Sequence, residues 1–325
     1  MNIQIKRSIE SDHVSDEEIV SLLLHDRGMT DKEGSLSPIH PYDIPFTDFF
    51  SERSFNRVLK KLEDIREKKE MIVVYTDYDA DGITGGAILW ETLHLLGCNV
   101  MPYVPHRKHE GYGFSKKGID AVKKQFNPRL IISVDHGISA SDKITYAKAL
   151  GISVVVTDHH MKSEKSPDDA YAVFHTDKLS GSGVAYFFAK EIFKKFPVGR
   201  SAFGLRLAED PAPREKSKLE KNFKKDYVVF ATIGTIADLV PLVGVSRSIV
   251  KHGLTVFPSL DRVGIRHILQ EAGIAHKPIT PYEIGFIIAP RINAVGRIRH
   301  AIDALRLLCT TQDARAFRLA HTVGH

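Results

Sequence analysis

Acidic and histidine side chains recur at four places in this chain, and their types suit divalent-metal chemistry. The four motifs are Asp77 with Asp79 and Asp81, Asp135 with His136, Asp158 with His159 and His160, and Asp238. Oxygen ligands mixed with an imidazole suit Mn²⁺ or Mg²⁺. Several carboxylates within about 4–6 Å of one another also need cations to offset their repulsion. We therefore expect a divalent-metal centre if the fold brings the four motifs together.

The elements before these motifs predict that they meet. Short apolar runs at residues 71–75, 99–104, 130–134 and 153–156 alternate with segments of helical pattern at residues 82–96, 115–124 and 141–150. Apolar runs separated by helices indicate a parallel sheet covered on both faces, which is the doubly wound α/β fold class. Ligands bind beyond the carboxyl ends of the strands in such sheets, and three of the motifs directly follow apolar runs.

Other readings of the first motif fail on spacing. An EF-hand loop requires Glu at its twelfth position, where this chain has Ile88, and it follows a helix rather than a strand. Gly82, Gly85 and Gly86 lack dinucleotide-binding spacing, and no P-loop lysine follows them, so no nucleotide cofactor is expected. A single aspartate after a strand often only caps the next helix. Four such motifs in one chain favour the metal centre.

The composition is that of an ordinary globular protein. The 325 residues are 43% hydrophobic and 26% charged, with a net charge of +5, which permits a polyanionic partner without requiring one. Cys98 and Cys309 lie far apart in sequence, which excludes a disulfide scaffold and a thiolate zinc site. The start of the chain lacks a secretory apolar segment, and the most apolar long stretch, residues 228–245, contains Asp238. We therefore expect a cytoplasmic protein without a membrane partner.

The segments outside the predicted sheet are expected to be helices and loops. Residues 1–53 form a helical and loop lead-in, in which Ser15 and Glu18 make a capping box. Residues 55–69 have the pattern of an amphipathic helix. Residues 199–225, rich in lysine and arginine, are expected to be an exposed basic insertion.

The four motifs resemble, in order and spacing, those of the DHH phosphoesterase superfamily. Other stretches resemble the RecJ-like single-strand-specific exonucleases within it, namely residues 19–28, 105–113, 181–184, 235–242, 246–253 and 290–297. Many relatives carry a histidine two residues before the first aspartate, where this chain has Tyr75. That difference would weaken the first metal site.

The resemblance implies two-metal hydrolysis of phosphodiesters. Asp135 would bridge two Mn²⁺ or Mg²⁺ ions; Asp77 and Asp79 would complete the first site. Asp81, His159 and Asp238 would complete the second, with Asp158 orienting His159. The residues expected at the substrate phosphates are Arg107, His160, Arg291, Asn293 and Arg297. The implied substrate is single-stranded DNA, degraded from its 5′ end to nucleotides, with a helicase or a single-strand-binding protein as a further partner.

The resemblance also implies a domain organisation. Residues 54–300 would be the DHH catalytic domain, and residues 301–325 would begin a connecting helix to a second, DHH-associated domain that this sequence does not contain. Two alternatives stay open. One is a phosphoesterase acting on short oligonucleotides or nucleotide phosphates, and the other is a truncated, non-catalytic module that binds single-stranded nucleic acid.

Overall fold

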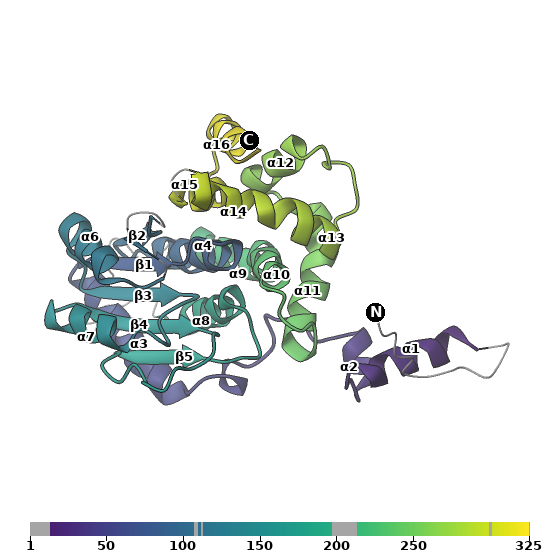
Figure 1. Cartoon of the computed structure of the whole chain (residues 1–325), viewed down its shortest axis with the longest axis horizontal. Coiled ribbons are helices and arrows are strands. Elements are labelled where there is room, and N and C mark those ends of the chain that lie inside the picture. Colours follow the sequence, from purple (N-terminus) through teal and green to yellow (C-terminus); the bar gives the residue numbers. More distant parts are fainter. Residues whose placement is uncertain (1–13, 107–109, 112, 197–212, 299–300, 325) are drawn as a thin grey trace, which may run out of the picture.

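The core of the fold is a five-stranded parallel sheet. The computed structural model describes residues 14–106, 110–111, 113–196, 213–298 and 301–324. The strands are β1 (Ile72–Thr76), β2 (Val100–Tyr103), β3 (Leu130–Val134), β4 (Ser153–Asp158) and β5 (Ala172–His175). They lie in the order β2-β1-β3-β4-β5 and all pair in parallel (Figure 1). The predicted doubly wound α/β class is confirmed, and β5 is a strand that the sequence pattern did not reveal.

Helices cover both faces of the sheet, because alternate side chains of each buried strand point to opposite faces. One face packs against α3 (Glu52–Glu67), α4 (Ala80–Leu95) and α8 (Gly181–Lys195) in the larger hydrophobic core. The other face packs against α6 (Lys116–Phe126) and α7 (Ser141–Ala149) in a smaller core.

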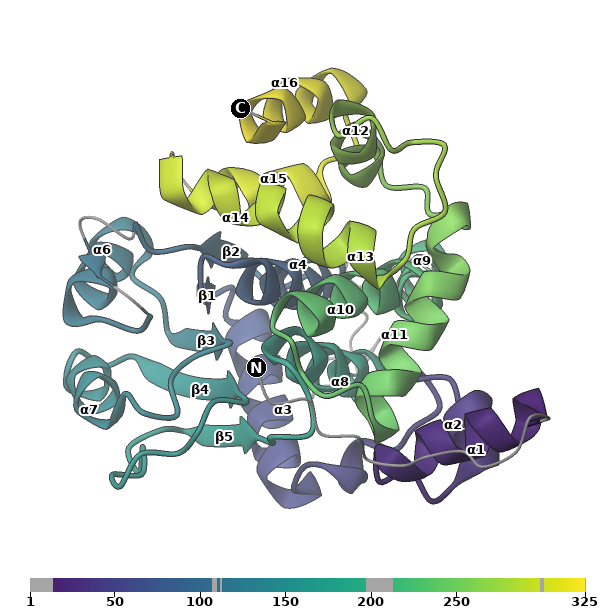
Figure 2. The same ribbon diagram turned by 45° about the vertical axis from the view of Figure 1, so that its right-hand side comes forward.

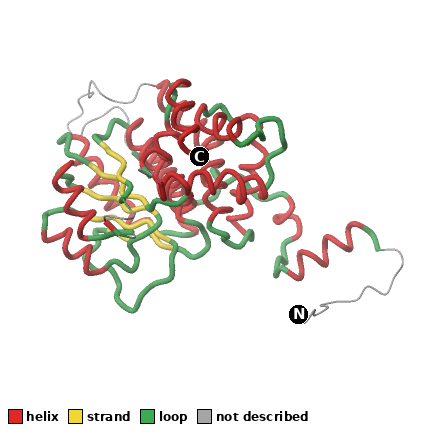
Figure 3. The backbone as a smooth tube through the Cα atoms, turned by 45° about the horizontal axis from the view of Figure 1, so that its top comes forward, coloured by secondary structure: helices red, strands yellow, loops and turns green. Residues whose placement is uncertain are grey.

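A wholly helical part follows the sheet and packs against α4 and α8 (Figures 1 and 3). Its elements are α9 (Pro213–Lys224), α10 (Asp226–Ala237), α11 (Gly244–Val256), η2 (Phe257–Ser259), α12 (Val263–Glu271), α13 (Pro281–Glu283), the π-helix η3 (Ile284–Ile288), α14 (Ala289–Ile298), α15 (Ile302–Cys309) and α16 (Asp313–Gly324). A buried ion network joins the two parts. Arg262 contacts Glu91 of α4 at 2.9 Å and Asp226 of α10 at 2.6 Å.

The expected basic insertion is only partly exposed. Residues 197–212 lie outside the described residues, and α9 follows them with Leu219 and Phe223 fully buried. The Phe223 ring stacks on Phe193 with 5.4 Å between centroids. In α9 the lysines lie on the outer face, while Leu219 and Phe223, an apolar pair at helical spacing, pack inward. For the remainder of the segment, exposure stays a prediction.

Residues 301–325 do not form the start of one connecting helix over the part described. They form α15 and α16, which are separated at Thr310, where the threonine hydroxyl accepts a hydrogen bond from the backbone N–H of Gln312. Helix α16 turns back to pack against α12 and α15. The apolar contacts between α16 and α12 therefore favour this turn over the continuation of α15 as one long helix.

The lead-in contains α1 (Asp16–Asp26), α2 (Lys32–Leu36) and η1 (Phe46–Asp48), and its predicted capping box is confirmed between Ser15 and Glu18. Lys190 of α8 fixes the loop between α2 and η1, because its buried ammonium group donates to the carbonyl oxygens of Pro41 and Ile44. Across the described residues, no helix combines the length and apolarity that crossing a membrane requires.

Candidate metal centre

The first acidic motif occupies the turn from β1 into α4. Asp79 is the N-cap of α4, and its side chain accepts a hydrogen bond from the Gly82 N–H at 2.9 Å. Asp77 is fully buried just before it. A Cβ atom on Gly82 would lie 2.8 Å from the Asp77 Cβ, so only glycine lets the helix start this close to the preceding carboxylate.

The side chain of Asp81 is fixed by the start of another helix. Its two carboxylate oxygens accept hydrogen bonds from the backbone N–H groups of Gly181, at 2.6 Å, and Ser182, at 3.0 Å. These are the first residues of α8, and a helix N-terminus favours a carboxylate. Sequence reasoning marked residues 181–184 only by resemblance and did not predict this contact.

Asp135 lies at the centre of the cluster. It follows β3 in the left-handed backbone conformation, with φ +66°, and its side chain is almost fully buried. Its Oδ1 lies 3.2 Å from His159 Nε2. Neither of these two atoms has a hydrogen-bond partner among the described residues, although both are buried. Buried polar atoms without partners are costly, and a cation between them would satisfy both.

Asp238 joins the cluster from the helical part of the chain. It is the C-cap of α10, and its Oδ2 lies 3.5 Å from His159 Nε2. Figure 2 shows why the motifs meet, because the carboxyl ends of the strands point toward α8 and α10. Tertiary packing thus places all four motifs at one edge of the sheet.

Three overlapping groups of side chains could each hold a metal ion, with ligand atoms within 4.8 Å of one another. They are Asp77 with Asp79 and Asp135, Asp81 with His159 and Asp238, and Asp135 with His159 and His160. Asp135 belongs to two groups and contributes a buried, unpartnered oxygen. The donor set of carboxylates and imidazole fits Mn²⁺ or Mg²⁺, and no thiol takes part.

The electrostatics of the cluster favour a bound cation. Burial and the neighbouring Asp81, Asp79 and Asp77 raise the pKa of Asp135 well above its usual value. Burial and Asp81 likewise raise the pKa of Asp79, and they raise that of Asp238 to about 6. Carboxylates held this close resist ionisation together, and divalent cations would relieve their repulsion.

Asp158 and His160 form a separate pair beside the cluster. Burial acts to raise the pKa of Asp158, but hydrogen bonds from the His160 ring and from the Ile138 N–H outweigh it and lower the pKa to about 2. The hydrogen bond of His160 Nδ1 to Asp158, at 2.8 Å, raises the pKa of His160 to about 9. The expectation that Asp158 orients the His159 ring was wrong. It accepts from the His159 backbone N–H and holds the ring of His160 instead.

The predicted phosphate contacts are only partly described. Arg107 lies outside the described residues, as does the side chain of Arg297. Asn293 Oδ1 accepts a hydrogen bond from the Ala80 N–H at 2.6 Å, so it braces the turn between Asp79 and Asp81. Arg291 donates to the Ile287 carbonyl oxygen. Contacts of these residues with phosphate stay predictions.

Tyr75 does not reach the metal ligands. Its fully buried ring packs in the smaller core against Phe114 and His136, with centroids 5.1 and 5.2 Å away. Its hydroxyl donates to the Gly113 carbonyl oxygen at 3.4 Å. The hypothesis that tyrosine here weakens the first metal site stays a prediction.

The part of the chain that forms the parallel sheet matches a recognised family. Residues 71–210 match the N-terminal domain of the DHH family. The predicted DHH resemblance is therefore confirmed, and the matched residues contain three of the four acidic motifs.

Within that family the chain is similar to single-stranded-DNA-specific exonucleases named RecJ. It is 31% identical to RecJ of Bacillus subtilis over 98% of this chain and 38% of that protein. It is 35% identical to RecJ of Thermus thermophilus over 78% of this chain and 35% of that protein. The chain thus spans less than half the length of these relatives.

Solved structures agree with the sequence relatives. A crystal structure of exonuclease RecJ bound to manganese matches with a TM-score of 0.68 and 32% identity, covering 86% of this chain and 66% of that one. RecJ from Thermus thermophilus in complex with Mn²⁺ matches with a TM-score of 0.69 and 30% identity, covering 94% of this chain and 41% of that one.

Proposed function

We propose that this chain binds two divalent cations and hydrolyses the phosphodiester bonds of single-stranded DNA. The observation that carries the proposal is the convergence of two ligand groups on Asp135, whose buried Oδ1 has no hydrogen-bond partner among the described residues. The similar RecJ proteins are named as single-stranded-DNA-specific exonucleases, and solved RecJ structures contain Mn²⁺ or Mg²⁺. Both findings support the proposal.

The proposal distributes the three ligand groups over two ions. Asp77 and Asp79 would hold the first ion, and His159, Asp81 and Asp238 would hold the second. Asp135, which is grouped both with Asp77 and Asp79 and with His159, would contribute to both. Bound divalent ions lower the pKa of water and offset the negative charge of a reacting phosphate. Asp81, anchored by α8, and Asp79, at the start of α4, keep the two groups at a fixed separation.

His160 is the residue that would contact the scissile phosphate. In the metal-free protein the hydrogen bond to Asp158 raises the pKa of His160 to about 9, and the side chain stays accessible, with 43% of it exposed. Asp158 holds the ring through Nδ1, which leaves Nε2 to donate to a phosphate oxygen. A preorganised cationic donor at this point would stabilise the charge that develops on the phosphate. Arg107, Arg291 and Arg297 are proposed to contact neighbouring phosphates.

The names of the relatives support single-stranded DNA as the substrate. We infer degradation from the 5′ end to nucleotides, in the cytoplasm. A helicase or a single-strand-binding protein would be a natural partner, because a single-strand nuclease needs its substrate to be unwound.

The test is hydrolysis of 5′- and 3′-labelled single strands of several lengths in Mn²⁺. Asp135→Asn keeps the shape of the side chain but removes the shared charge, and it should lower the rate by at least about a thousandfold. Asp261→Asn, at an exposed aspartate remote in sequence from the four motifs, is the matched control and should keep the wild-type rate. Wild-type activity in Asp135→Asn would refute the two-ion assignment.

The product pattern separates the alternatives. Single nucleotides released first from the 5′ end support the exonuclease. Cleavage of dinucleotides and short oligonucleotides alone indicates a small-substrate phosphoesterase. Binding of strands without any product indicates a binding module.

A further inference from the structure

An exposed apolar stripe runs along the helix that passes the metal centre. This helix continues from α13 through η3 into α14, residues 281–298. Tyr282 and Phe286 are 61% and 72% exposed, and their rings stack on each other with 5.0 Å between centroids. Pro290, four residues further along, is also exposed. These three residues form the apolar stripe, and clustered apolar groups at a surface are typical of a binding site.

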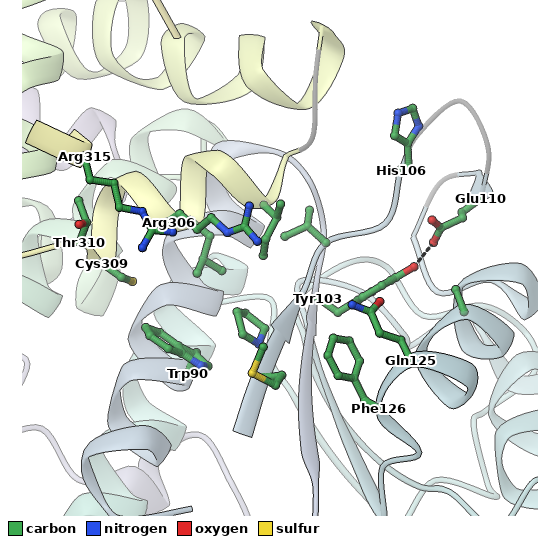
Figure 4. A pocket seen from close by; sticks show the side chains of 16 residues that line it. Trp90, Tyr103, His106, Glu110, Gln125, Phe126, Arg306, Cys309, Thr310 and Arg315 are labelled. Atoms are coloured by element: carbon green, nitrogen blue, oxygen red, sulfur yellow. Dashed lines mark hydrogen bonds between the residues drawn. The ribbon is translucent and has the colours of Figure 1, made fainter. Parts of the chain in front are cut away.

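Aromatic rings elsewhere near the surface are already used by the fold. In the cavity at the outer edge of β2, Trp90 stacks on His94 with 5.3 Å between centroids (Figure 4). The Tyr103 hydroxyl donates to Glu110 at 2.5 Å, and its ring packs on the smaller core. Tyr282 and Phe286 differ from these rings because most of their surface faces solvent.

The apolar stripe lies beside the metal ligands. Gly285 separates its two aromatic residues in sequence, and a Cβ atom there would lie 3.5 Å from the Ile236 side chain, two residues before Asp238. Helix η3 accordingly packs against α10, as Figure 2 also shows. Further along the same helix, Asn293 accepts its hydrogen bond from the Ala80 N–H. Phe286 precedes Asn293 by seven residues, which is about 10 Å along a helix.

The metal centre is open on this side. The side chains of Asp81 and Asp135 are only 2% exposed, whereas that of Asp238 is 31% exposed. Leu239, directly after it, points largely into solvent and has the left-handed backbone conformation, with φ +58°. A side chain other than glycine adopts this conformation at a cost, and such residues are found mostly at functional sites. A phosphate at the ions therefore has its open approach past Asp238, next to the apolar stripe.

Two further features of this helix indicate a binding surface. Phe286 lies within the π-helical segment η3, and π-helical turns are rare and occur frequently at functional sites. Arg291 directly follows Pro290. Its Nη1 donates to the Ile287 carbonyl oxygen, and its buried Nε has no hydrogen-bond partner among the described residues. A backbone phosphate at the end of the stripe would satisfy the remaining donors of this guanidinium group.

We propose that the apolar stripe is the surface on which the bases of a single strand stack as the strand passes the metal centre. The inference rests on the proposed function and names the residues that contact the bases. Aromatic rings stack on every base, so the surface tolerates any sequence. In a duplex the faces of the bases are already covered by their neighbours. The stripe therefore favours single strands without taking part in hydrolysis.

The test compares two fluorescein-labelled strands of about twelve nucleotides. One carries adenine at every position, and the other has the same phosphates but abasic sites throughout. Binding is followed by fluorescence anisotropy in EDTA, which prevents hydrolysis, and at low salt, which strengthens phosphate contacts. The protein should bind the adenine strand at least about tenfold more tightly than the abasic strand. The double variant Tyr282→Ala with Phe286→Ala should lose most of this preference and bind the abasic strand as wild type does.

The controls separate stacking from apolarity and from folding. Phe286→Trp should keep the preference for the adenine strand, because it keeps an aromatic ring, whereas Phe286→Leu should lower it at least about fivefold. Phe317→Ala is the matched control, because Phe317 is another exposed phenylalanine, on α16. It should keep the wild-type preference. A thermal unfolding curve verifies that each variant is folded.

Three outcomes would overturn the proposal. They are equal affinity of the wild-type protein for the two strands or no binding of either, equal losses for both strands in the double variant, and a dimer that the double variant dissociates while strand binding stays unchanged. The last outcome would assign the stripe to a second copy of the chain. Because binding is measured without metal, loss of hydrolysis in Mn²⁺ would not affect it. Conversely, the absence of a base preference would leave the proposed hydrolysis unaffected.

Discussion

Replacing Gly181 by alanine should disable the candidate metal centre while leaving the chain folded. The new Cβ would lie 2.3 Å from Asp135 Oδ1 and 2.5 Å from its Cβ, whereas ordinary contact begins near 3.4 Å. The backbones of Asp135 and Gly181 cannot shift easily to relieve this contact. The Asp135 N–H donates to the Thr157 carbonyl oxygen, and the Gly181 N–H donates to Asp81. A displacement of about 1 Å is therefore forced on the shared ligand.

The expected size of the effect follows from that displacement. Misplacing a reacting group by about 1 Å costs roughly a hundredfold in rate. Overpacking a dense interior costs about 1–3 kcal/mol of stability, which a chain of this length should survive. We expect Gly181→Ala to lower the initial rate on single-stranded DNA about a hundredfold and to weaken Mn²⁺ binding measured by electron paramagnetic resonance.

Gly183→Ala is the matched control in the same helix turn. Its Cβ would meet the Leu179 side chain at 3.2 Å and the Ser180 hydroxyl at 3.5 Å, and its N–H would still donate to Ser180. Its rate and Mn²⁺ affinity should stay within tenfold of wild type. If Gly181→Ala kept both quantities within threefold of wild type, the close approach of α8 to Asp135 would not matter, and the reasoning would be refuted.

Three further predictions concern residues around the site and in the core. Asp158→Asn should lower the pKa of His160 from about 9 toward its ordinary 6.5, as measured by NMR titration of the metal-free protein. It should also slow hydrolysis about tenfold or more. An unchanged pKa of His160 would contradict its pairing with Asp158. Asn293→Ala should weaken Mn²⁺ binding, because the Ala80 N–H loses its acceptor, while Asn293→Asp should retain it; equal affinities in the two variants would count against this bracing role. Burial lowers the pKa of Lys190 from 10.5 to about 7, so its amine binds a proton more tightly in the unfolded chain than in the folded one. The contribution of Lys190 to the free energy of unfolding should therefore rise between pH 7 and pH 9. Lys190→Met should remove that rise in denaturant titrations, and parallel slopes in the two proteins would show that another group is responsible.

Much of the fold could be predicted because its signals are local. The apolar runs that became β1, β3 and β4, and the capping box at Ser15, depend on neighbouring residues. The failures occurred where tertiary contacts decide. Strand β5 has only four residues, and its pairing with β4 stabilises it in the sheet. Helix α9 was expected to be exposed, but its buried Phe223 packs against Tyr186 and Phe193 of the distant helix α8.

The sequence by itself determined the order of the acidic motifs and their position after strands, and parallel pairing then brings the first three together. It could not determine which atoms meet. The contact between Asn293 and Ala80 joins residues 213 positions apart, and the hydrogen bonds to Asp81 come from an α8 start 100 positions away. Even Asp158, adjacent to His159, holds the ring of His160 instead. Spacing sets which residues can reach one edge of a sheet, but packing of α8, α10 and α14 fixes the ångström-scale geometry on which metal binding depends.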